Sequence, residues 1–200
     1  MHTTSSIYST CNSTLTHNLM SPYQCLKSER GPDFGIFKVR IDHQKNNRNQ
    51  HVLKAVVLEA ADSANVVAIT PDQKIILVRQ FRFGIGKETL EIPGGMVDKG
   101  EVVQTACARE LLEETGYASK NWRYLGPVQS NPVYMDSLLH QYIATDVVLV
   151  NQELKLDPAE QIDVVCLPRE EVRQLILDRT IQHPHTLTAL MQYFWEIDRQ

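Results

Sequence analysis

Three glutamates within five positions dominate the chemistry that this chain could perform. Glu110, Glu113 and Glu114 stand at i, i+3 and i+4, so a helix of about 3.6 residues per turn places them on one face. Like charges at this spacing repel one another, which makes the arrangement costly unless a cation lies among them. Hard divalent metals prefer oxygen ligands, so the spacing predicts a magnesium site on this helix. The other side of the helix carries residues that can pack on a core: Thr105, Ala108, Leu111 and Leu112.

These acids belong to a longer pattern with set spacing. It begins at Gly95, passes through Glu101 and ends in the run RELLEETG, which covers residues 109–116. This pattern resembles the Nudix box, although Tyr117 stands where the box usually closes with an aliphatic residue. A plain solvated helix with an Arg109–Glu113 ion pair is the simpler interpretation, but it does not account for the flanking glycines.

The resemblance to the Nudix hydrolases implies cleavage of a nucleoside diphosphate linked to another group, with Mg²⁺ as the metal and Mn²⁺ as a substitute. We expect Glu110 and Glu114 to bind the metal, Glu113 to share it, and the backbone carbonyl of Gly94 to complete the ligand set. Arg109 is assigned to the catalytic residues, and we expect Arg109 and Glu101 to orient these acids, because a guanidinium can hold a carboxylate at two points.

The general base stays open between three carboxylates. In the related ADP-ribose pyrophosphatases a loop beyond the box supplies a carboxylate, and the loop LKLDPAEQID offers Glu160 first and Asp157 second. Glu113 is the alternative base.

Several features favour ADP-ribose or a similar nucleoside diphosphate sugar as substrate. The segment VRQFRFG resembles the lead-in of the ADP-ribose pyrophosphatase branch, where the arginine matching Arg82 meets substrate phosphate. Pro132 lies close to the position of that branch's marker proline, and Gly95 is assigned to the substrate site. Residues 60–65 lack the tryptophan that some relatives have, so base stacking is expected from Phe37, with Phe34 and Tyr23 as alternatives. GDP-mannose, a UDP-sugar, an oxidised nucleoside triphosphate and a non-catalytic ADP-ribose sensor remain alternatives.

The elements that must position these residues follow from the apolar pattern. Residues 34–41 and 51–59 predict an antiparallel hairpin. Further strands are expected at 65–70, 74–81, 89–92, 122–129, 138–147 and 161–167, with helices at 102–115, 168–178 and 185–197. This order indicates the α+β class, and the resemblance implies the Nudix α/β/α sandwich with a mixed β-sheet and an N-terminal antiparallel β extension.

The chain divides into three predicted parts. A Ser/Thr-rich segment over residues 1–30 is expected to be a disordered tail, and either Met1 or Met20 could be its start. Residues 31–60 form the hairpin extension, through which the resemblance implies a homodimer. Residues 61–200 form the Nudix domain with its C-terminal helices.

Composition limits the other possibilities. The net charge of −4 and the lack of a basic stripe argue against nucleic-acid binding, and no apolar run is long enough for a membrane helix. The four cysteines form no paired motif, which is consistent with a cytoplasmic protein.

Overall fold

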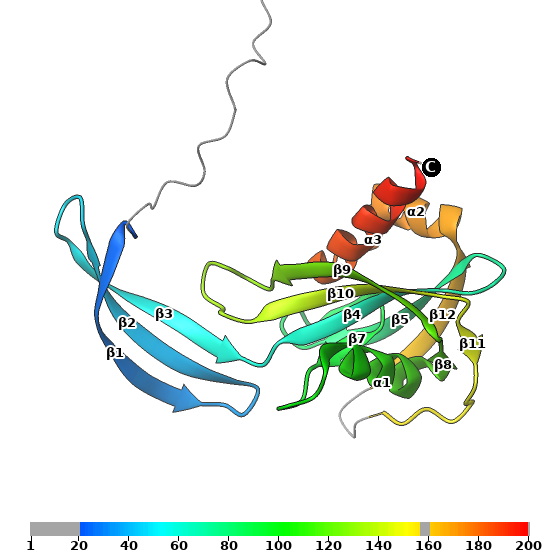
Figure 1. Cartoon of the computed structure of the whole chain (residues 1–200), viewed down its shortest axis with the longest axis horizontal. Helices are drawn as coiled ribbons and strands as arrows, with labels where there is room; N and C mark the ends of the chain where they lie inside the picture. Colours follow the sequence, from blue (N-terminus) through cyan, green and yellow to red (C-terminus); the bar gives the residue numbers. More distant parts are fainter. Residues whose placement is uncertain (1–20, 157–160, 200) are drawn as a thin grey trace, which may run out of the picture.

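The computed structural model describes residues 21–156 and 161–199, and it contains a large mixed sheet with helices on both sides (Figure 1). The large sheet has seven strands, in which the order β12-β5-β4-β10-β9 is extended by β6 beside β5 and β7 beside β4. Its strands are β4 (Ser63–Ile69), β5 (Lys74–Arg82), β6 (Lys87–Glu91), β7 (Gly94–Met96), β9 (Asn121–Gln129), β10 (Leu138–Thr145) and β12 (Ile162–Pro168). The pair β4 and β10 is parallel, whereas the other pairs are antiparallel, so the predicted mixed sheet is confirmed.

Three helices cover the two faces of this sheet. Helix α1 (Val103–Thr115) lies on one face, and α2 (Arg169–Leu177) and α3 (Pro184–Ile197) lie on the other (Figure 1). Strand β4 shows why both faces must be covered, because successive side chains point to opposite sides. Val67 packs in the cluster beneath α2 and α3, whereas Val66 packs in the cluster beneath α1. The α/β/α sandwich expected from the sequence is confirmed.

Helix α1 is delimited by the flanking residues of the box. It ends at Gly116, which adopts a left-handed conformation with φ of 73° and donates its N–H to the Leu112 carbonyl. The predicted core face was partly wrong. The buried positions are Ala106, Cys107, Leu111, Glu114 and Thr115, whereas Leu112 is exposed. Cys107, Leu111 and Glu114 are spaced by four and three residues, so the face that meets the core also carries one of the box carboxylates.

The N-terminal extension is a separate sheet of three strands, not a two-stranded hairpin. Strands β1 (Tyr23–Asp33), β2 (Phe37–Asn46) and β3 (Val52–Ala60) pair antiparallel in that order. We call this sheet the arm, because it projects away from the sandwich (Figure 1). The prediction that residues 1–30 form a disordered tail is wrong for residues 23–30, since they pair with β2. The apolar pattern of the sequence does not predict this strand, because it contains many polar residues such as Lys27 and Glu29. Residues 1–20 lie outside the described part of the chain.

The arm is joined to the sandwich by more than its connecting chain. The Leu58 N–H donates to the Tyr134 carbonyl at 2.7 Å, and the Asp136 N–H donates to the Leu58 carbonyl at 3.4 Å. Arg40 of the arm forms an ion pair with Asp136 at 3.6 Å. The loop between β9 and β10 therefore continues the edge of the arm.

Two shorter strands and a long loop complete the described chain. Strand β8 (Tyr117–Ala118) pairs with β11 (Val148–Leu149) beyond the end of α1. The following segment turns back toward α1, where the Lys155 N–H donates to the Glu113 carbonyl at 3.2 Å. None of the helices in the described ranges is both long and apolar enough to cross a lipid bilayer.

Candidate active site

Arg109 organises the acidic face of α1. Its Nε and Nη2 donate to both oxygens of Glu101, at 3.2 and 3.1 Å. Its Nη1 reaches Glu110 at 2.7 Å and Glu113 at 3.1 Å, and Nη2 also donates to the Met96 carbonyl at 3.1 Å. One guanidinium thus holds three carboxylates. Hydrogen bonding to Arg109 lowers the pKa of Glu101, so this carboxylate is ionised at neutral pH.

The turn before the helix contacts two of the box glutamates. The Gly94 N–H donates to Glu114 Oε2 at 2.9 Å, and the Glu114 residue is only 2% exposed. A Cβ placed on Gly95 would lie 2.5 Å from the Glu110 carboxyl carbon, so a larger residue there would force that carboxylate to move. Gly95 therefore lets the backbone of β7 approach Glu110 closely, whereas the lack of a side chain at Gly94 lets that backbone approach Ala64 and Asn65 of β4.

These groups line one concave surface, which we call the acidic cleft. Its volume is about 550 Å³ and its walls are Gln80, Arg82, Gly94, Gly95, Met96, Asp98, Arg109, Glu110, Glu113, Glu114 and Lys155. The donor set consists of carboxylate and carbonyl oxygens, which is the chemistry that Mg²⁺ and Mn²⁺ select. In the described ranges no three acidic, histidine or cysteine side chains converge closely enough to hold an ion as they stand. Arg109 and the Gly94 N–H instead donate to carboxylate oxygens of the box.

Arg82 lies between the acidic cleft and a second concavity. This second space, which we call the side cavity, has a volume of about 620 Å³ and lies between β4, β6, β7 and the start of α3. Arg82, Gly94, Gly95 and Met96 line both spaces, so the two are adjacent. A ligand with a charged middle and two bulky ends could occupy both.

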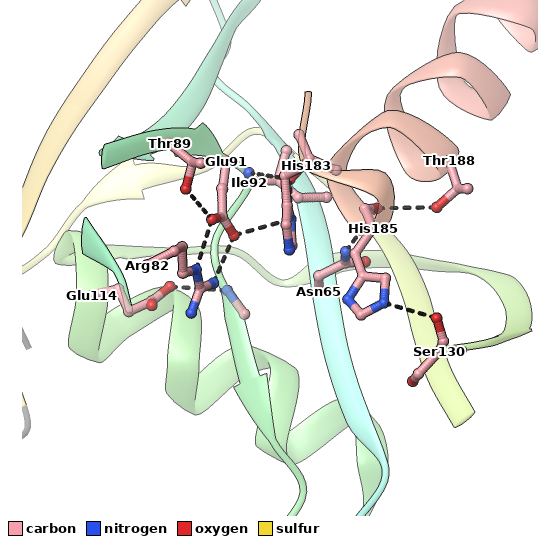
Figure 2. Close-up of polar contacts among 12 residues, drawn as sticks. Asn65, Arg82, Thr89, Glu91, Ile92, Glu114, Ser130, His183, His185 and Thr188 are labelled. Atoms are coloured by element: carbon pink, nitrogen blue, oxygen red, sulfur yellow. Dashed lines mark hydrogen bonds and ion pairs between the residues drawn. The ribbon is translucent and has the colours of Figure 1, made fainter. Parts of the chain in front are cut away.

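A buried carboxylate holds Arg82 at this junction. Arg82 Nε and Nη2 donate to the two oxygens of Glu91 at 2.7 and 2.6 Å (Figure 2). Thr89 Oγ1 donates to one of these oxygens, and His183 Nδ1 lies 3.0 Å from the other. Burial opposes ionisation of Glu91, but the hydrogen bonds from Arg82 and Thr89 outweigh it and lower the pKa of Glu91. Burial lowers the pKa of His183 to about 4.

The structure brings most of the predicted site residues together. Arg82, Gly94, Gly95, Arg109 and the three box glutamates all line the acidic cleft. Phe37 lies elsewhere in the described chain, at the start of β2, with its ring 5.3 Å from that of Phe34. Pro132 lies in the turn between β9 and β10 and is not one of the described residues that line the acidic cleft or the side cavity. Asp157 and Glu160, two of the three candidate bases, lie outside the described residues.

Three residues of the site were not predicted from the sequence: Glu91, His183 and Lys155. Glu91 immediately precedes Ile92-Pro93-Gly94, and an acid at the end of an apolar strand was a usable signal. His183 is 92 positions away along the chain, and nothing in its surroundings predicted that the start of α3 would reach β6. Lys155 enters the acidic cleft because its loop bonds back to α1.

The fold and the site define the class of the protein: an α/β/α sandwich with an acidic helix whose oxygen atoms suit a divalent cation. The comparison with known families gives the particular one. A model of the NUDIX domain matches residues 60–190, so the chain belongs to the Nudix family and is a Nudix hydrolase. The family predicted from the box is therefore confirmed.

Relatives and solved structures agree with this assignment. The chain is 30% identical over 165 residues to the methanol dehydrogenase activator of Bacillus methanolicus, covering 82% of this chain and 89% of the relative. It is 29% identical over 142 residues to the ADP-ribose pyrophosphatase of Bacillus subtilis (strain 168), covering 71% and 77%. The crystal structure of an ADP compounds hydrolase matches with a TM-score of 0.77 over 89% of this chain and 95% of that chain. Its identity of 23% makes this likeness one of fold.

Proposed function

We propose that this Nudix hydrolase cleaves the diphosphate of ADP-ribose, giving AMP and ribose 5-phosphate. The observation that carries the proposal is the meeting of the acidic cleft and the side cavity at Arg82. A nucleoside diphosphate sugar has a charged centre between two uncharged ends, and this arrangement offers a place for each. The ADP-ribose pyrophosphatase among the relatives supports ADP-ribose as the first substrate to test.

In the reaction, water adds to one phosphorus of the diphosphate and the bridging P–O bond breaks. The water proton is released, and each product leaves as a phosphate monoester. Arg82 would hold a phosphate oxygen, and Arg109 would orient Glu110 and Glu113. Glu113, Asp157 and Glu160 are the candidates to accept the proton from water.

Glu110, Glu113, Glu114 and the Gly94 carbonyl would hold the metal ion. When bound, Mg²⁺ would offset the negative charge of the diphosphate and make the attacking water more acidic. Mn²⁺ is proposed as a substitute, because it accepts the same oxygen ligands.

We also propose that the protein is a homodimer joined through the arm. The arm is a single layer, and it exposes large apolar side chains that no second layer of the described chain covers: Leu26, Phe34, Ile36 and Val56. Small sheets that are not covered are marginally stable in water, so a second copy is a reasonable partner. In such a dimer Phe37 and Pro132 could line a substrate site at the interface. A cytoplasmic location is proposed because the three cysteines in the described ranges are free thiols.

A substrate panel tests the proposed activity. Purified protein is incubated with Mg²⁺ and, separately, ADP-ribose, GDP-mannose, UDP-glucose and 8-oxo-dGTP, and the products are separated by chromatography. We expect AMP and ribose 5-phosphate from ADP-ribose, with the highest kcat/KM of the panel. Release of pyrophosphate from the triphosphate alone would contradict the proposal.

A further inference from the structure

We infer that Glu91 and His183 are positioning residues that hold the Arg82 guanidinium toward the substrate diphosphate. This inference rests on the proposed function, and it extends the site to the start of the C-terminal helix. Neither residue need touch the substrate, because both act through Arg82. The three side chains come from β5, β6 and the residue before α3, and they meet at the wall of the side cavity (Figure 2).

Glu91 and Arg82 differ in how deeply they are buried. Glu91 is 2% exposed, whereas the Arg82 side chain is 41% exposed and lines both cavities. A carboxylate removed from water is costly unless hydrogen bonds satisfy it, and Arg82 supplies two of those bonds. Here the buried acid is the support and the half-exposed cation is the group presented to a ligand.

The hydrogen bonds around Glu91 also fix the direction of the Arg82 side chain. Two parallel hydrogen bonds from Arg82 to Glu91 fix the plane of the guanidinium as well as its position. Glu91 is itself fixed by Thr89 on its own strand and by His183 from the other side of the cavity. A long, flexible arginine is thereby held in one direction before any ligand arrives, which reduces the entropy lost on binding.

The neutral state of His183 also suits it to hold Glu91. With a pKa of about 4, set by burial, His183 is neutral at neutral pH and can donate its Nδ1 proton to Glu91. A neutral histidine holds the carboxylate without competing with Arg82 as a cation. Thr186, in the first turn of α3, lies 3.2 Å from the same nitrogen and accepts the Ile92 N–H, which ties the helix start to β6.

A double-mutant cycle separates positioning from general stability. The variants are Arg82→Ala, Glu91→Gln and the pair together, and each is measured for KM and kcat with Mg²⁺ and for the Kd of ADP-ribose in EDTA by calorimetry. We expect Glu91→Gln to raise KM and Kd about tenfold with little change in kcat, because a phosphate contact acts on ground state and transition state alike. In the Arg82→Ala background the same substitution should change Kd less than about twofold.

His183 is tested by a conservative pair of variants. His183→Asn keeps an N–H donor near the Nδ1 position, whereas His183→Leu removes it. We expect Asn to retain a Kd within about threefold of wild type and Leu to weaken binding by about the same factor as Glu91→Gln. Glu196→Gln is the matched control, since Glu196 pairs with Arg123 away from both the acidic cleft and the side cavity, and its Kd should match wild type. Thermal melting of every variant identifies any that fail to fold.

The outcomes distinguish this inference from the proposed function. Coupled losses in Kd support the inference, even if the wild type releases no AMP and the proposed function is thereby wrong. If the fold-changes in Kd caused by Glu91→Gln and Arg82→Ala multiply in the double variant, the inference is overturned. Turnover of ADP-ribose by the wild type would still support the proposed function. Equal Kd values for His183→Asn and His183→Leu would show that His183 is not a positioning residue for Arg82. A wild type that binds no ADP-ribose overturns the inference.

Discussion

At the scale of single residues, the site depends on one cation that three acids share. Arg109 contacts Glu101, Glu110 and Glu113, so it offsets the repulsion that their spacing creates. Glu114 is different, because it is buried and accepts a backbone N–H from Gly94. Substitutions that keep the size of these side chains should therefore affect chemistry more than folding.

Glu114→Gln should lower kcat about a hundredfold, without unfolding the protein. The amide keeps the size of the side chain but loses the charge that a divalent cation requires. Steady-state kinetics with saturating Mg²⁺ measure the effect, and circular dichroism confirms the fold. Turnover close to that of wild type would remove Glu114 from the metal site.

Gly95→Ala should reduce kcat/KM at least about tenfold, because the added methyl group would collide with the Glu110 carboxylate. Gly100→Ala is the matched control for the loss of a glycine near the box, since its added Cβ meets no atom within 4 Å. The control should keep its kcat/KM even if its left-handed backbone costs some stability. Equal losses in the two variants would count against the close approach at Gly95.

At the scale of elements, α1 carries the acids only because its two ends are fixed. Its start follows the β7 turn, and its end at Gly116 allows the chain to reverse toward β8. A Cβ at Gly116 would also strike the Asn151 carbonyl, so backbone strain and contact act together there.

Gly116→Ala should therefore destabilise the protein by about 1–3 kcal/mol. Chemical denaturation monitored by tryptophan fluorescence measures the change in the free energy of unfolding. Because Gly116 is not among the described residues that line the acidic cleft, kcat should fall less than in Glu114→Gln. A variant as stable as wild type would show that the end of α1 relaxes without cost.

The sandwich could be predicted largely from sequence because its central strands β4 and β5 are buried on both faces and its helices are amphipathic. Strand β4 reads as a continuous apolar run, which is typical of a strand covered on both sides. Strand β1 could not be predicted in the same way. It is polar and exposed along most of its length, so its strand conformation depends on pairing with β2.

The residues of the candidate site likewise fall into those that a local sequence pattern predicts and those that only the fold brings together. The box acids were predictable because they lie within one helix turn of one another, and Arg82 was found through the family resemblance. Glu91 and His183 were not found, since only the folded chain brings the start of α3 to β6. A contact between distant segments leaves no local pattern in a single sequence.

At the scale of the whole molecule, the arm and the sandwich are linked through the loop between β9 and β10. On one side this loop bonds to β3 of the arm, and on the other the Ser130 carbonyl lies 3.4 Å from His185 Nε2 at the start of α3 (Figure 2). The proposed dimer contact is therefore connected to the wall of the side cavity by a short path.

A charge on the exposed arm should separate the proposed dimer. We expect Ile36→Glu combined with Val56→Glu to shift sedimentation from a dimer to a monomer, because burying unpaired carboxylates at an interface is costly. Leu177→Glu is a control of similar exposure on α2, and it should leave the assembly unchanged. Wild-type protein that sediments as a monomer would contradict the proposed dimer.

We propose above all that the acids of α1 form a binding site for a divalent cation. A titration with Mn²⁺, monitored by electron paramagnetic resonance, tests this proposal directly. The signal of free Mn²⁺ is measured with the wild type, Glu110→Gln and Glu114→Gln, without substrate. We expect saturable binding of Mn²⁺ by the wild type, with an affinity that is weakened about tenfold to a hundredfold in each variant. Equal Mn²⁺ affinity in all three proteins would contradict it.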